Sequence, residues 1–303
     1  MRICSLLPSS TEIVYALGLG DQLVAVTHEC DHPSEASRLP RVTRSLIDHS
    51  SSTSGEINRH VAEAVHGGSS IYALDQHELE RLNPDLILTQ ELCEVCAVSY
   101  GEVRKAVRML PGDRKVLSLE PTSLGGILDS ITEVGVVTGT ERRAKEVVAS
   151  LRRRIEHVTT KAAKARSKPK VFAMEWLDPL FVGGHWVPEM IRLAGGVDGL
   201  GRENRPSFIV EWKDIAAYAP DVVVVMPCGY DLARTQDKLR EVRLPEAWHA
   251  LPAVRHGRVY AVDGSGYFNR PGPRIVDGLE IMAEILHPDL FPRKHDKNWA
   301  QVT

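Results

Sequence analysis

The sequence predicts an α/β protein with two similar lobes joined by a single long α-helix. Residues 79–90 (LERLNPDLILTQ) and 215–227 (IAAYAPDVVVVMP) repeat one another, because each places a helix end and a Pro-Asp pair before an apolar run. Such a run is typical of a strand buried on both faces of a parallel sheet. The flanking strands repeat too, since RICSLL is similar to KVFAME and RKVLSLEP to GRVYAVDG. Residues 140–166 lack Pro and Gly and carry apolar residues at helical spacing, which predicts the joining helix.

The length of 303 residues favours two domains, because it exceeds what one compact core usually holds. We expect an N-terminal lobe over residues 1–121, connecting helices over 122–168 and a C-terminal lobe over 169–303. The helix over 140–166 would form a rod of about 40 Å. Such a rod would hold the two lobes at a nearly fixed separation. We therefore expect only a small closure around a ligand in the cleft between them.

The elements of each lobe follow from the same patterns of apolar runs and helix caps. In the first lobe we expect a strand over 2–7, a PSST loop with Ser10 or Thr11 as N-cap, a helix over 11–17, strands over 23–27, 85–89 and 115–119, and helices near 56–66 and 100–109. In the second lobe we expect strands over 170–175, 222–226 and 258–262 and helices over 187–194 and 274–286. The charged residues 291–303 are expected to fray.

Composition excludes several classes of protein. The net charge of −3 gives no basic footprint for nucleic acid, and no apolar run reaches the roughly 20 residues that span a bilayer. The first residues do not fit a signal peptide, because Pro8 and Glu12 interrupt the apolar stretch. Five irregularly spaced cysteines do not fit a disulfide framework. We therefore expect a cytoplasmic protein with reduced thiols.

Polar and aromatic residues gather where the predicted strands end, which is where α/β sheets bind ligands. Aromatic residues on loops suit stacking against a large, flat and partly apolar ligand, and the Arg fork suits a carboxylate or phosphate. The candidate ligand-binding residues are Ser9, Ser10, His28, Glu29, Cys30, Gln90 and Cys93 in the first lobe and Glu175, Trp176, His185, Trp186, Cys228, Tyr230, Tyr267, Phe268, Asn269 and Arg270 in the second.

Several of these segments together resemble one family. The segments are the opening RICSLLPSSTEIVYALGLGDQLVAVTHECDHP, then LNPDLILTQELCEVC, EWLDPLFVGGHWVPEMIRLAGG, PDVVVVMPCGYDLART and GRVYAVDGSGYFNRPGPR. They are similar to the iron-siderophore and vitamin B12 class of ABC-transporter substrate-binding proteins, and more narrowly to its leaderless cobalamin-binding branch. The resemblance covers about residues 1–287. It implies two Rossmann-like lobes of the class III periplasmic-binding-protein fold, no required cofactor, and cobalamin or another metal chelate as a non-covalently bound ligand.

An enzyme or metal-binding protein is the alternative. His28, Glu29, Cys30, Cys93 and Cys228 could hold a metal or supply a nucleophile if they converge. Cys93 and Cys96 have the spacing of a zinc knuckle or redox pair, although no second such pair follows. Packing or ligand contact is the simpler interpretation of that loop. Under this alternative, the protein is a cytosolic metal-dependent enzyme or metal-binding protein and does not bind a chelate as a substrate-binding protein does.

The resemblance also implies one exposed Glu in each lobe that pairs with permease arginines. The corresponding positions are His77 and Lys213, neither of which is acidic, although Glu78 and Asp214 follow them directly. A Lys facing an Arg is a like-charge contact. We therefore expect a small-molecule ligand as the partner, with docking to an ABC permease in doubt.

Overall fold

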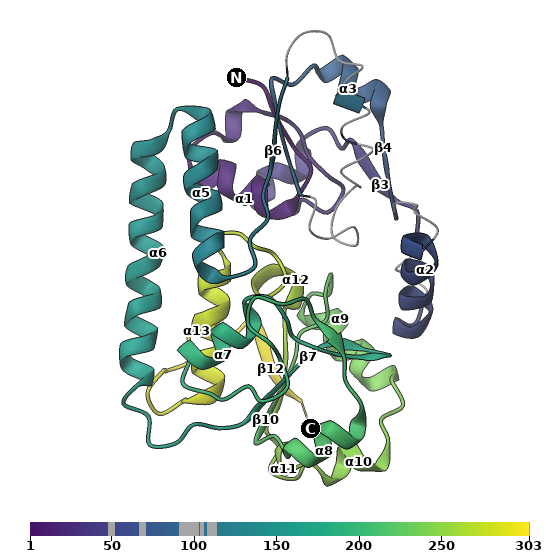
Figure 1. Cartoon of the computed structure of the whole chain (residues 1–303), viewed down its shortest axis with the longest axis vertical. Helices are drawn as coiled ribbons and strands as arrows, with labels where there is room; N and C mark the ends of the chain where they lie inside the picture. Colours follow the sequence, from purple (N-terminus) through teal and green to yellow (C-terminus); the bar gives the residue numbers. More distant parts are fainter. Residues whose placement is uncertain (48–51, 67–70, 91–102, 104–105, 108–113, 303) are drawn as a thin grey trace. The chain divides into compact units, whose positions relative to one another are not determined.

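The computed structural model describes the 303 residues except 48–51, 67–70, 91–102, 104–105, 108–113 and 303 (Figure 1). The chain forms two compact units: unit one holds residues 1–121 and 125–149, and unit two holds residues 122–124 and 150–303. The division falls within helix α6 (Glu141–Ala162), which therefore runs from one unit into the other. The separate connecting segment over 122–168 stays a prediction.

Unit one contains a parallel sheet with the strand order β2-β1-β5-β6. Its strands are β1 (Ile3–Ser5), β2 (Leu23–Ala25), β5 (Leu86–Thr89) and β6 (Lys115–Ser118). An antiparallel pair, β3 (Thr43–Ser45) and β4 (Tyr72–Leu74), forms a second small sheet. The helices are α1 (Pro8–Ala16), α2 (Ser54–His66), α3 (Gln76–Leu82) and α5 (Leu124–Thr138), with short 3-10 turns at Gly20–Gln22 and Ser34–Arg38.

Unit two contains a mixed sheet with the strand order β12-β11-β10-β7-β8-β9. The parallel strands β7 (Val171–Leu177), β10 (Val222–Val225) and β11 (Val259–Val262) form its centre, and β8 (Leu180–Val182), β9 (Phe208–Ile209) and β12 (Trp299–Val302) extend it with antiparallel pairs. The helices are α7 (Val187–Leu193), α8 (Trp212–Tyr218), α9 (Leu232–Glu241), α10 (Glu246–Ala250), α11 (Pro252–Arg255), α12 (Gly264–Tyr267) and α13 (Ile275–Leu286).

The predicted repeat is confirmed in atomic detail. Asn83 and Ala219 end α3 and α8 in the left-handed conformation, directly before the two Pro-Asp pairs. In unit one the Asp85 carboxylate accepts the Arg2 backbone N–H at 2.7 Å, and in unit two the Asp221 carboxylate accepts the Lys170 N–H at 2.8 Å. Each aspartate thus fixes the start of its strand beside the strand that opens the unit.

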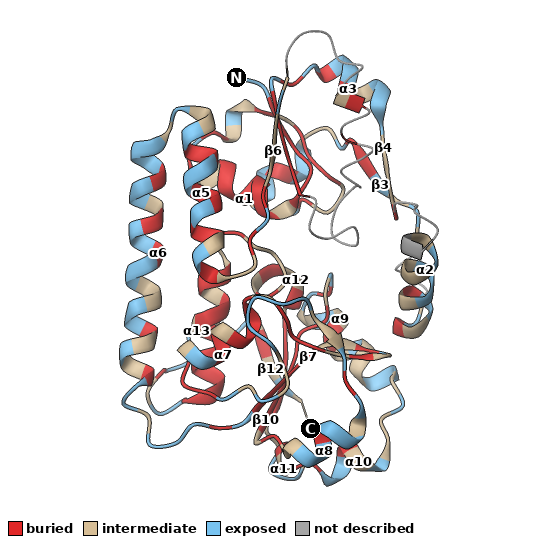
Figure 2. Ribbon diagram, viewed as in Figure 1, coloured by how far each residue is buried: buried red, intermediate tan, exposed pale blue. Residues whose placement is uncertain are grey.

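Two predicted helices begin or end elsewhere. Helix α1 begins at Pro8 rather than after the PSST loop, because Pro fits the first turn, where a backbone N–H has no helical partner. Helix α6 holds 22 residues rather than the whole of 140–166. Its predicted apolar stripe is confirmed, since Ala144, Val148 and Leu151 are buried, and Figure 2 shows the rest of its surface mostly exposed.

The fraying expected of residues 291–303 is wrong for residues 291–302, and residue 303 lies outside the described residues. Residues Trp299 to Val302 form β12, which pairs with β11 from Val259↔Val302 to Val262↔Trp299. The charged residues before β12 are held by a buried carboxylate on α13, whose long buried side is visible in Figure 2. Charge patterning alone does not reveal such a partner.

The strand-fixing aspartate of unit two can be tested by removing its carboxylate. Asp221→Ala should lower the free energy of unfolding by about 1 kcal/mol, the usual contribution of one hydrogen bond. Asp289→Ala, at an exposed position of the same unit, is the control and should change it by less than about 0.5 kcal/mol. Denaturant unfolding measures both. Equal effects of the two substitutions would show that Asp221 does not fix the strand.

Candidate functional site

The carboxyl edge of the unit-two sheet carries most of the predicted ligand-binding residues. The ladder between β7 and β10 ends at Met174↔Val225, and β7 continues to Leu177 before β8 returns antiparallel. Glu175 and Trp176 therefore lie just beyond the parallel ladder, on a hairpin. The backbone N–H of Cys228, in the loop after β10, donates to the Glu175 carbonyl at 3.3 Å and joins the two loops.

Trp176 is a half-buried aromatic side chain with a buried support. Its ring centroid lies 5.3 Å from that of Tyr230, which is 2% exposed. The Arg234 guanidinium covers the Tyr230 ring at 4.1 Å from its centroid. The Trp176 Nε1–H also donates to the Asp178 carbonyl at 3.1 Å, which restricts rotation of the indole. These contacts leave a fixed aromatic surface that is partly open.

Trp186 and Phe268 have a different role, because both are buried. Trp186 is 7% exposed and its Nε1–H donates to the Phe268 carbonyl at 2.7 Å, while the Phe268 side chain is fully buried. These two residues join the start of α7 to the loop after α12. Their burial leaves almost no surface for a ligand, so the structure favours packing over the stacking role expected for them.

His185 occupies a constrained turn between β8 and α7. Its φ of +51° lies in the left-handed region, and its backbone is held by His185 N–H to the Arg205 carbonyl at 2.5 Å and Asn204 N–H to the His185 carbonyl at 2.9 Å. Burial lowers the pKa of the His185 imidazole, so the ring is neutral near pH 7. A neutral imidazole offers a lone pair to a metal or a hydrogen bond to a polar group.

The adjacent carboxyl of Glu175 positions that turn. Its Oε2 accepts the Gly184 N–H at 3.1 Å, and Gly184 packs so closely against the backbone of residues 205–207 that no side chain would fit there. Burial raises the pKa of Glu175, against the effect of hydrogen bonds from Ser207 and the Gly184 N–H. Glu175 is therefore a structural acceptor within the loop.

The loop of residues 263–274 completes this edge. Asp263 caps α12 by accepting the Gly266 N–H at 2.7 Å, and the Asn269 side-chain amide donates to the Met226 carbonyl at 3.0 Å. Tyr267 is half-buried, with the Arg274 guanidinium 5.3 Å from its ring centroid. Arg270 is half-buried as well. The loop thus presents an aromatic ring and cationic groups on a hydrogen-bonded frame.

In unit one, the predicted residues Ser9 and Ser10 after β1 and Cys30 after β2 lie in the interior. Ser9 is 4% exposed, Ser10 is fully buried and Cys30 is 1% exposed. The Ser10 hydroxyl lies 2.7 Å from the Ser5 hydroxyl, and the Cys30 thiol lies 3.1 Å from the Thr11 hydroxyl. These side chains form a buried polar network that joins β1, α1 and the loop after β2. Ligand contact by these residues is not favoured in this conformation.

His28 is a half-buried imidazole of unit one. Its Nδ1 lies 2.8 Å from the Thr43 hydroxyl, its Nε2 lies 3.5 Å from Glu29 Oε1, and its ring packs on Tyr72 at 5.3 Å between centroids. Burial lowers the pKa of His28, while Glu29 acts in the opposite direction. Thr43 and Tyr72 belong to the small β3–β4 sheet, which the sequence patterns did not predict.

Gln90 directly follows β5 and is buried, at 8% exposed. Cys93 and Cys96 lie outside the described residues, so the expectations for them stay predictions. Among the residues that the structure describes, Cys4, Cys30 and Cys228 form no disulfide bond. Cys4 is fully buried, and burial raises the pKa of its thiol.

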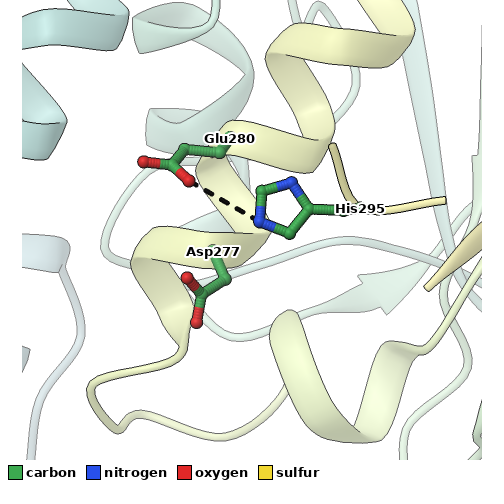
Figure 3. A group of neighbouring side chains, drawn as sticks. All are labelled: Asp277, Glu280 and His295. Carbon is green, nitrogen blue, oxygen red and sulfur yellow. Dashed lines mark ion pairs between the residues drawn. The ribbon is translucent and has the colours of Figure 1, made fainter. Parts of the chain in front are cut away.

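Within the described residues of unit one, His28, Glu29 and Cys30 of the predicted metal set do not form a group of metal-type ligands. Within either unit, the one such group among the described residues is Asp277, Glu280 and His295, whose ligand atoms lie within 4.8 Å (Figure 3). The Arg154 guanidinium already binds this group, with Nε 2.9 Å from Glu280 Oε1 and Nη2 on Asp277. A fixed cation therefore occupies the centre of negative charge, and we interpret the group as a salt-bridge network.

The two positions expected to face a permease are exposed on repeat-related helices, His77 on α3 and Lys213 on α8. The acidic neighbour Glu78 pairs with Arg81 at 2.7 Å, and Lys213 pairs with Glu211 at 2.6 Å. Weakened docking to a permease stays a prediction. Across the described residues, the structure contains no helix with the length and apolar character needed to cross a membrane.

Comparisons with known proteins identify the family. The sequence model described as periplasmic binding protein matches residues 3–265. The chain is 28% identical over 300 residues to the uncharacterized ABC transporter substrate-binding lipoprotein YvrC of Bacillus subtilis, covering 96% of this chain and 81% of the relative. It is 24% identical over 287 residues to the vitamin B12-binding protein of Vibrio cholerae, covering 94% of this chain and 88% of that protein.

Solved structures show the same fold. The periplasmic vitamin B12-binding protein BtuF of Vibrio cholerae superposes with a TM-score of 0.68 at 24% identity, covering 94% of this chain and 96% of that chain. A periplasmic heme-binding protein of Pseudomonas aeruginosa gives a TM-score of 0.73 at 21% identity, covering 100% of this chain and 98% of that chain. The predicted class III fold of two α/β lobes is therefore confirmed.

These comparisons also correct one prediction and decide between two others. The cytoplasmic location is wrong, because the relatives are a lipoprotein and periplasmic proteins, which act outside the cytoplasm. The first residues form β1, so the strand explains their apolar pattern. That pattern does not indicate the compartment in which the protein acts. The relatives are substrate-binding proteins, which confirms the non-enzyme prediction and does not favour the metal-dependent enzyme. With the family model matching residues 3–265, the chain belongs to the periplasmic binding protein family.

Proposed function

We propose that the protein binds a large, flat metal chelate of the tetrapyrrole type, with a corrinoid such as cobalamin as the first candidate. Binding is non-covalent and uses the loops at the carboxyl edge of the unit-two sheet. The observation that carries the proposal is the partly open Trp176 ring supported by buried Tyr230 and by Arg234. The vitamin B12-binding and heme-binding proteins among the relatives and structural neighbours support this ligand class.

The chemistry of the neighbouring loops fits such a ligand. A macrocycle offers a broad apolar face, against which an aromatic side chain can stack with little loss of conformational entropy because its support is already ordered. The Arg270 guanidinium, on the 263–274 loop, suits a peripheral carboxylate or phosphate. The participation of unit one, and with it the predicted site in the cleft between the lobes, stays a prediction.

The ligand class can be tested by titration. Cobalamin, cobinamide, heme and a ferric siderophore are added to the purified protein, and binding is followed by absorbance and calorimetry. At least one should bind with a Kd below about 10 μM, which corresponds to about −7 kcal/mol. The circular dichroism spectrum confirms that the protein is folded. Failure of all four ligands with folded protein would refute the proposal.

The different roles of the two tryptophans give a second test. Trp176→Ala should weaken binding of the chelate by about 1–3 kcal/mol and change the unfolding free energy little, because it removes a partly open ring. Trp186→Ala should instead lower the unfolding free energy by about 3–5 kcal/mol, because it empties a buried site.

Trp176→Phe is the matched control for the first variant. It keeps an aromatic face and should retain most of the affinity, whereas loss of the indole N–H affects only the bond to Asp178. Affinity is measured by titration and stability by denaturant unfolding for all three variants. Unchanged affinity in Trp176→Ala would place the site elsewhere.

A further inference from the structure

The C-terminal residues 291–302, here called the strap, are fixed to two elements of unit two. Through β12 the strap pairs with β11, and the Asn298 carbonyl accepts the backbone N–H of Asp263 at 2.9 Å. Asp263 is the residue that caps α12 and begins the candidate ligand loop 263–274. The strap therefore contacts the loop at its first residue.

A single buried carboxylate holds the strap to α13. Glu284 is 4% exposed. It accepts the Lys294 N–H at 3.1 Å, the Trp299 Nε1–H at 3.1 Å and the His295 N–H at 3.4 Å, and its Oε1 lies 2.7 Å from His295 Nδ1. All four of these groups belong to the strap. Hydrogen bonds to a charged acceptor are stronger than neutral ones, so this cluster is a strong polar attachment of the strap to α13.

His295 lies between this carboxylate and a second one. Its Nε2 is 3.6 Å from Glu280 Oε2 (Figure 3). Because its Nδ1 pairs with Glu284, the imidazole bridges two carboxylates of α13. The groups facing it from α13 are Asp277, Glu280 and Glu284, and Arg154 of α6 pairs with the first two. Three carboxylates thus face one arginine, and a protonated His295 adds the second positive charge.

The strap itself adds charges that point elsewhere. The Arg293 guanidinium stacks on the Trp299 ring at 3.9 Å and donates to the Trp299 carbonyl at 2.6 Å. Lys294 and Asp296 are exposed. From α6, Lys161 lies over the Phe291 ring at 5.0 Å. Among the described residues of the strap itself, His295 is the ionisable group that bridges two carboxylates of α13.

Helix α13 carries this attachment to the other end of the ligand loop. The loop 263–274 leads directly into α13, and Gly278 packs against the Tyr267 carbonyl so closely that a Cβ would not fit. The loop therefore rests on the helix that holds the strap, while its first residue is bonded to the strap. A shift of the strap would act on the loop at both places.

We propose that protonated His295 clamps the strap to α13 and thereby holds the 263–274 loop in its binding arrangement, so that the protein binds its ligand more tightly in mildly acid than in alkaline solution. The ligand part of this proposal rests on the proposed function. The clamp itself concerns residues of unit two alone.

The direction of the pH dependence follows from the geometry. The hydrogen bond with Glu284 raises the pKa of His295, so its stabilising effect is complete below the ordinary histidine pKa and is lost as pH rises through the raised value. Burial alone would raise the pKa of Glu284, but hydrogen bonds from His295, Trp299 and the Lys294 N–H together lower it. Its contribution is lost only as pH falls through that lowered value. The clamp is therefore closed between the lowered pKa of Glu284 and the raised pKa of His295.

Hydrogen exchange with and without the imidazole tests the clamp. Exchange of backbone amides in residues 263–274 and 291–302 is followed at about pH 5.5 and about pH 9, on either side of the ordinary histidine pKa, with rates corrected for intrinsic pH dependence. At the lower pH, His295→Gln should exchange about tenfold faster than the native protein in both segments, the effect of losing one charge-assisted hydrogen bond. At the higher pH the native protein and His295→Gln should exchange at similar rates in both segments. His256→Gln, at an exposed position of the same unit, should behave as native.

A second variant covers the case in which His295→Gln folds poorly. Glu284→Gln keeps a hydrogen-bonding side chain but removes the charge, and should shift the pH midpoint of native-like protection to lower pH, with the His295 titration followed by NMR. Equal exchange of the native protein and His295→Gln at the lower pH, or an unmoved midpoint in Glu284→Gln, would refute the clamp. A response of the strap without one in residues 263–274 would refute its coupling to the loop.

Binding of cobinamide at the two pH values tests the final step. The native protein should bind about tenfold more tightly at the lower pH, and His295→Gln should lose this difference. If hydrogen exchange follows the prediction but the affinity for cobinamide does not change with pH, the link between the clamp and binding is refuted. If cobinamide, cobalamin, heme and the ferric siderophore all fail to bind at both pH values, the proposed function fails, while the exchange data still decide the clamp. If added Zn²⁺ slows amide exchange in the strap at the higher pH, these residues form a metal site and not a clamp that depends on protonation, and the proposal is overturned.

Discussion

Parallel pairing of β7, β10 and β11 is the constraint on which the candidate site depends. Because these three strands run in one direction, the residues that follow them emerge at one edge of the sheet. The backbone bond from Cys228 to Glu175 and the side-chain bond from Asn269 to the Met226 carbonyl then join the three loops. Residues separated by almost 100 positions in the sequence thus share one surface without any covalent link.

Burial separates the residues of that surface into two kinds. Trp176 and Tyr267 keep part of their rings open, while Tyr230, Trp186 and Phe268 lie beneath and hold the loops in place. A binding surface of this construction is ordered before a ligand arrives, which reduces the entropy lost on binding. The same supports also explain why substitutions of chemically similar side chains should have opposite effects on affinity and stability.

The sequence was sufficient to predict the two α/β units, because an apolar run after Pro-Asp is a local signal that recurs at Asp85 and Asp221. It also located the carboxyl-edge loops. It could not distinguish Trp176 from Trp186, since both follow strands and only tertiary packing buries the second. The β3–β4 pair and the strap were missed for a related reason: their stability comes from distant partners, such as Glu284 for the strap, and not from local propensity.

The proposed function depends on a metal chelate that stacks on Trp176 at this edge. A crystal of the protein soaked or grown with cobinamide, measured near the cobalt absorption edge, locates the metal by its anomalous scattering without reference to the protein. We expect a cobalt peak opposite the Trp176 ring, with the corrin plane in contact with the indole and close to the 263–274 loop. A fully occupied cobalt site remote from Trp176 and from that loop would contradict it.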